Sequence, residues 1–91
     1  MTSRRSAGAF AAGVSRALRS GGLLPLGSGA PYTRQGIRVR ANGETWANVS
    51  VDLDQPRQAA RLADEVAEVL TAAGYTTERN SDTMIRATRK A

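Results

Sequence analysis

The sequence predicts a small α+β domain in which helices pack on one face of an antiparallel sheet of four or five strands. Two segments place apolar residues at helical spacing, and four shorter segments are typical of strands. Gly, Pro and Asn-Gly breakers separate these segments in the order αββαββ. A chain of 91 residues provides one core of this kind. We therefore expect a single domain over residues 8–91, preceded by a basic, flexible arm at residues 1–7.

The first helix is expected over residues 8–19. Phe10, Val14 and Leu18 recur one helical turn apart, and Gly21 and Gly22 should end the helix. A loop rich in Gly and Pro follows at residues 20–36, with room for a short edge strand at residues 23–26.

A hairpin is predicted over residues 36–41 and 45–53, because Asn42-Gly43 is a strong turn signal between two strand-like segments. A tight two-residue loop would place Val39 opposite Trp46 and scatter the apolar residues over both faces. A three-residue or bulged loop instead gathers Val39 with Val49 on one face. We favour this second register because it buries one consistent apolar face beneath a helix.

The favoured register has a consequence for the other face of the sheet, which stays open. Arg38, Arg40 and Trp46 share that face, and Arg86 of the last strand joins them. Guanidinium groups beside an indole suit a protein interface, a nucleic-acid contact or mutual packing without a ligand.

The second helix is expected from about residue 55 or 56 to residue 73. Asp54 is a suitable N-cap, Pro56 suits the first turn, and Gly74 stands where a left-handed residue ends a helix. Two strands, at residues 75–80 and 83–89, should complete the sheet as a second hairpin.

Charge is distributed unevenly along the chain. Residues 1–43 contain seven arginines and no acidic residue, whereas residues 44–91 contain six basic and eight acidic residues. A basic segment of this kind indicates a nucleic acid, an anionic surface or an acidic protein partner, or else simply a solvated arm.

Enzymatic readings find little support in the composition. The chain contains no His and no Cys, so the usual neutral-pH base, the thiolate nucleophile and the standard zinc ligands are missing. Asp52 and Asp54 could together hold Mg²⁺, but we favour Asp54 as a helix cap and Asp52 as a solvated residue. We expect no enzyme, cofactor or metal, and no small-molecule substrate. No apolar run is long enough to span a membrane.

Two resemblances add to this interpretation. The segment "LTAAGYTTERNSDTMIRATR" resembles small messenger-RNA-cleaving toxins, but it lacks their histidine and so implies no activity. The segments "ALRSGGLLPLGSG", "GIRVR", "VDLDQPRQAARLADEV" and "AGY" resemble short proteins of phages that infect high-GC actinobacteria, a group with no settled function. That resemblance implies a virion component, an assembly factor or a small regulator, located in the host cytoplasm or the virion.

We therefore expect a non-enzymatic binding protein that contacts a protein partner or a second copy of itself. The alternative is a regulatory protein that binds nucleic acid. In either case the expected contact residues are Arg4, Arg5, Arg16, Arg19, Arg34, Arg38, Arg40, Trp46 and Arg86.

Overall fold

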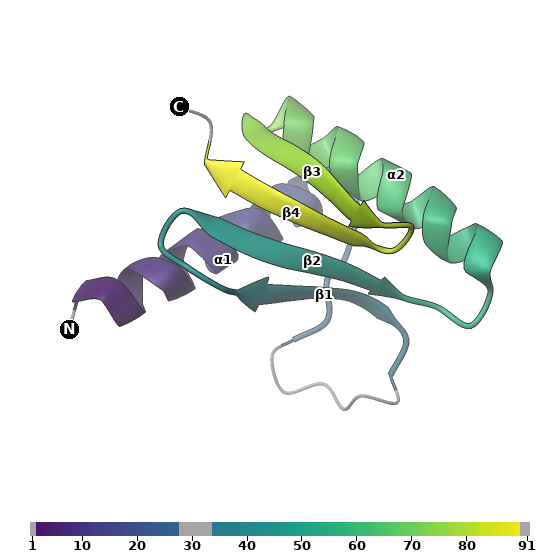
Figure 1. Cartoon of the computed structure of the whole chain (residues 1–91), viewed down its shortest axis with the longest axis horizontal. Helices are drawn as coiled ribbons and strands as arrows, with labels where there is room; N and C mark the ends of the chain where they lie inside the picture. The colour runs from purple at the N-terminus through teal and green to yellow at the C-terminus, as the bar shows by residue number, and fades with distance from the viewer. Residues whose placement is uncertain (1, 28–33, 90–91) are drawn as a thin grey trace.

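The computed structural model describes residues 2–27 and 34–89 and confirms the α+β class (Figure 1). Two helices, α1 (Thr2–Ser20) and α2 (Pro56–Ala72), contact each other and cover the same face of an antiparallel sheet. The sheet has the spatial order β1-β2-β4-β3, so β2 and β4 are central. Its four strands are β1 (Gly36–Ala41), β2 (Trp46–Asp52), β3 (Tyr75–Ser81) and β4 (Met84–Arg89).

Helix α1 begins at Thr2, so the predicted boundary between a basic arm and a helix at residue 8 lies inside this element. The segment before residue 8 contains no proline, and Ala and Arg are good helix formers, so nothing local stops the helix. The predicted end is confirmed: Gly22 has φ +89°, and the Leu23 N–H donates to the Leu18 carbonyl at 2.9 Å. These contacts form a Schellman motif, which satisfies the last carbonyls of the helix.

The edge strand expected at residues 23–26 is reduced to one contact. Pro25 forms an isolated parallel bridge with Ile37, and the Leu26 N–H donates to the Ile37 carbonyl at 2.7 Å. Proline has no N–H to donate, so it does not continue a ladder. The bridge nevertheless covers part of the outer edge of β1.

The register of the β1–β2 hairpin places the apolar residues on the face that we favoured. Val39 pairs with Val49 and Ile37 with Val51, and these four side chains face the helices as part of the core or packed against it. The connection itself is longer than predicted, because residues 42–45 lie between the two strands. The same side chains still face the helices, because the observed pairing is shifted by an even number of residues from the pairing that a three-residue loop would give.

The N-cap prediction for α2 is wrong. Gln55 occupies the N-cap position, and no side chain caps the helix there. Asp54 instead pairs with Gln35: its Oδ2 accepts from Gln35 Nε2 at 2.7 Å, and its N–H donates to Gln35 Oε1 at 3.1 Å. Proline in the first turn has no N–H to satisfy, so a side-chain cap is needed less.

The core lies between the helices and the sheet. It is built from α1, α2 and the inward positions of the strands, and Gly74 ends α2 with φ +100° as expected. In the described part of the chain neither helix is long and apolar enough to cross a membrane. The buried core residues are Phe10, Val14, Leu18, Ile37, Ala47, Val49, Val51, Ala59, Ala63, Val66, Leu70, Ile85 and Ala87.

Candidate interaction face

The face of the sheet opposite the helices carries the candidate site. Side chains alternate across a strand, so positions that neighbour buried core residues point away from the helices. We call this surface the open face. Cross-strand pairing brings its residues together as Arg38, Arg40, Trp46, Asn48, Ser50, Asp52, Thr76, Glu78, Met84, Arg86 and Thr88.

Trp46 belongs to the open face but is half-buried within it. The Arg86 guanidinium lies over the indole, 5.0 Å from the ring centroid. The backbone of Gly43 approaches the pyrrole side so closely that a Cβ there would stand 2.5 Å from Trp46 Nε1. Trp46 is therefore packed between the hairpin turn and β4, and its cation partner is Arg86 rather than Arg38 or Arg40.

The charges of the open face are mixed in sign and largely paired. Arg38 Nε lies 3.1 Å from Asp52 Oδ2, its Nη2 donates to the Arg34 carbonyl at 2.9 Å, and its side chain is only 13% exposed. Arg86 lies 3.9 Å from Glu78, a long and exposed contact that contributes little energy. Arg40 is exposed, and it forms no ion pair with the part of the chain that the structure describes.

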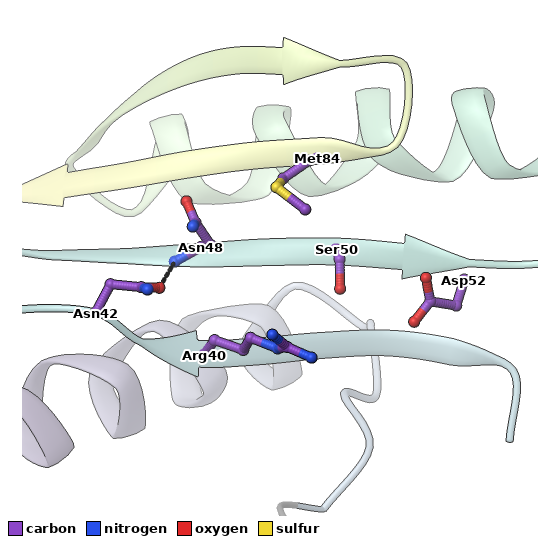
Figure 2. A pocket seen from close by; sticks show the side chains of 6 residues that line it. All are labelled: Arg40, Asn42, Asn48, Ser50, Asp52 and Met84. Carbon is purple, nitrogen blue, oxygen red and sulfur yellow. Dashed lines mark hydrogen bonds between the residues drawn. The ribbon is translucent and has the colours of Figure 1, made fainter. Parts of the chain in front are cut away.

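A shallow hollow of about 340 Å³ opens on this face above β1 and β2 (Figure 2). Asn42 lies at the rim of the hollow and is fixed there by a hydrogen bond: its Oδ1 accepts from the backbone N–H of Asn48 at 3.3 Å. The carboxylate in its wall, Asp52, is the partner of Arg38. The hollow is lined by Arg40, Asn42, Asn48, Ser50, Asp52 and Met84.

Asn48 has an unusual position in this hollow. Its Oδ1 is buried and finds no hydrogen-bond partner among the described residues. In Figure 2 that oxygen points toward β4, away from Arg40. A buried acceptor without a partner reduces stability, so the amide at this position is not explained by the fold alone.

We expect Asn48→Leu to leave the free energy of unfolding unchanged or to raise it by about 1 kcal/mol. The substitution removes an unpaired buried acceptor, and a strand accepts the apolar side chain. The hydrogen bond to Asn42 Oδ1 persists, because its donor is the backbone N–H of residue 48. Urea unfolding measures this effect, and a loss of more than about 1 kcal/mol would show that the amide oxygen has a structural partner.

The structure does not bring all of the predicted contact residues together. Arg16 and Arg19 are exposed on α1, in the layer opposite the open face, and Arg34 is exposed in the segment before β1. The predictions for Arg4 and Arg5 fall on side chains outside the described residues. Sequence reasoning missed Asn42, because an Asn-Gly pair was interpreted only as a turn signal.

The possible Mg²⁺ pair, Asp52 and Asp54, lies beside a flatter hollow at the end of β2. Both carboxylates are already engaged, Asp52 with Arg38 and Asp54 with Gln35. Asp52 is exposed to solvent, as expected, and it also forms an ion pair with Arg38 of the open face, which the sequence did not predict.

Comparison of the chain with models of protein families, with curated proteins and with solved structures found no significant match. The case for a function therefore depends on the geometry of the open face.

Proposed function

We propose that this chain is a non-enzymatic protein-binding module that acts as an interaction or assembly component through its open face. The observation that supports this proposal is the mixed set of paired charges around a hollow, next to an Arg86–Trp46 stack. Arg and Trp are enriched at the energetic centres of protein interfaces, and a mixed-sign surface matches another protein surface.

The same charges argue against a polyanion as the occupant of this face. A phosphate backbone needs a continuous cationic track, and base stacking needs an accessible aromatic ring. Here Asp52 and Glu78 interrupt the track, and Trp46 is covered by Arg86 and Gly43.

The variant Ser50→Tyr tests the proposal. Ser50 lies at the centre of the open face between Arg38 and Met84, so a phenol ring there would block a docked partner while suiting a strand. We expect at least a tenfold loss of affinity, about 1.4 kcal/mol, for a partner first isolated with the wild-type chain. Calorimetry or surface plasmon resonance measures it.

The matched control is Glu68→Tyr, which adds the same ring at an exposed position of α2. It should bind as the wild type does, and both variants should unfold at the wild-type urea midpoint. Equal affinity for Ser50→Tyr and the wild type would contradict the proposal.

One observation supports a second candidate, nucleic-acid binding by α1. Arg16 and Arg19 are exposed there, and no acidic residue occurs in residues 1–43. This function would use the opposite layer of the domain. A mobility shift at low salt that Arg16→Ala and Arg19→Ala weaken, and that Ser50→Tyr leaves unchanged, would establish it instead.

A further inference from the structure

The hollow on the open face is lined by several hydrogen-bond donors and by one carboxylate, and the inference drawn from it rests on the proposed function. We infer that it is a subsite for one carboxylate, an Asp, Glu or C-terminal group of the partner protein, with Arg40 as the cation that receives it.

Arg40 is the open-face arginine that has neither an ion pair nor a ring contact among the described residues. Arg38 is committed to Asp52 and to the Arg34 carbonyl, and Arg86 lies over Trp46 and near Glu78. Arg40 is exposed at the wall of the hollow without an ion pair among the described residues. Its planar guanidinium can donate two parallel hydrogen bonds to a carboxylate, which gives geometry as well as charge.

The neutral side chains around Arg40 also offer donors. Asn42 uses its oxygen to accept from the Asn48 backbone, which leaves its NH₂ group to donate. Asn48 also lines the hollow; its side-chain oxygen points toward β4 and away from Arg40 (Figure 2), and its NH₂ group is a donor. Ser50 adds a hydroxyl. A hollow with four donor side chains is suited to an acceptor-rich anion.

The acidic member of the lining limits what can enter. Asp52, which lines the hollow, lies 3.1 Å from Arg38, so the charges of Arg38, Arg40 and Asp52 sum to one positive charge around the hollow. One uncompensated cation matches one carboxylate. A phosphate diester chain would bring further negative charges next to Asp52 and Glu78, which disfavours it here.

The test uses the whole chain and two small probes in a titration followed by NMR. The probes are N-acetyl-glutamate N-methylamide and its neutral counterpart, N-acetyl-glutamine N-methylamide. We expect saturable shifts of the Arg40 Nε–H and of the Asn42 and Asn48 side-chain amide signals with the carboxylate probe at millimolar concentrations. The neutral probe should not cause them.

Arg40→Gln should abolish these shifts and lower the affinity for the isolated partner about tenfold, a loss of about 1.4 kcal/mol of binding free energy. Arg57→Gln, at an exposed position of α2, should change neither. Arg40→Lys should restore only part of the affinity, because an ammonium lacks the planar fork.

Several outcomes would overturn the inference. They are equal shifts with both probes, shifts that persist in Arg40→Gln, and tighter binding of inorganic phosphate or a short oligonucleotide than of the carboxylate at the same residues. If Ser50→Tyr weakens binding of the partner and Arg40→Gln does not, the carboxylate subsite is wrong while the protein-binding function stands. If neither variant weakens it, both fail.

Discussion

Leu18→Ala is expected to lower the free energy of unfolding by about 3 kcal/mol, the largest single effect that we predict. Leu18 lies on the inner face of α1 and is fully buried in the core. Its carbonyl also accepts the hydrogen bond from the Leu23 N–H in the Schellman motif. The substitution removes apolar contacts and leaves a cavity in a packed interior. A small domain has about 5–15 kcal/mol of net stability, so the loss is a large share.

Urea unfolding followed by far-UV circular dichroism measures this change, and Leu24→Ala is its control. Leu24 is 79% exposed, so its truncation should change the free energy of unfolding by no more than about 0.5 kcal/mol. A loss below about 1 kcal/mol for Leu18→Ala would mean that α1 does not pack on the sheet in solution.

Arg79→Ala is expected to destabilise the domain by about 1–2 kcal/mol, because Arg79 ties the β3–β4 hairpin to α2. Its Nη1 donates to Asp64 Oδ1 at 2.6 Å, and its other donors reach the carbonyls of Ala60, Ser81 and Asp82 at 3.4, 3.1 and 2.9 Å. The ion pair alone would be worth little at 36% and 65% exposure. The effect is larger because one guanidinium donates to four acceptors, two on α2 and two at the turn of the β3–β4 hairpin.

Arg79→Lys separates charge from geometry. Lysine keeps the charge next to Asp64 but cannot present five donors in a plane, so most of the loss should remain. Arg57→Ala, at an exposed position of α2, should stay within about 0.5 kcal/mol of the wild type. If Arg79→Lys unfolds as the wild type does, the carbonyl contacts contribute nothing measurable.

Local patterns in the sequence predicted most of the fold. The alternation around Val39 and Val49 was enough to choose the face that the β1–β2 hairpin buries, because a slip by one residue would have exposed both side chains. The glycine stops of both helices were predictable for a similar reason, since a left-handed residue at a helix end favours Gly.

Features that depend on contacts between distant residues could not be predicted. Asp54 looked like a helix cap, but Gln35, 19 residues earlier in the chain, takes its hydrogen bonds. The partners of Arg79 include Asp64 and a helix carbonyl, which no local spacing reveals. Arg86 reaches Trp46 because β4 pairs with β2 in the sheet order β1-β2-β4-β3.

The candidate site was predicted in part. Its two halves, the arginines of the first helix and the Arg/Trp face, were expected to serve one contact surface. The structure places Arg16 and Arg19 in the helix layer and Arg40 on the open face, on opposite sides of the sheet. A sequence pattern assigns residues to faces of one element, but the layer on which an element packs depends on the whole core.

Site-specific photocrosslinking tests most directly whether the partner docks on the open face. A benzophenone side chain is placed at Thr76, which lies beside Thr88 on the open face, or at Glu65, which is exposed on α2. We predict that irradiation of the complex joins the partner to the Thr76 position and not to the Glu65 position. Crosslinking at Glu65 alone would contradict the claim and place the interface on the helix layer.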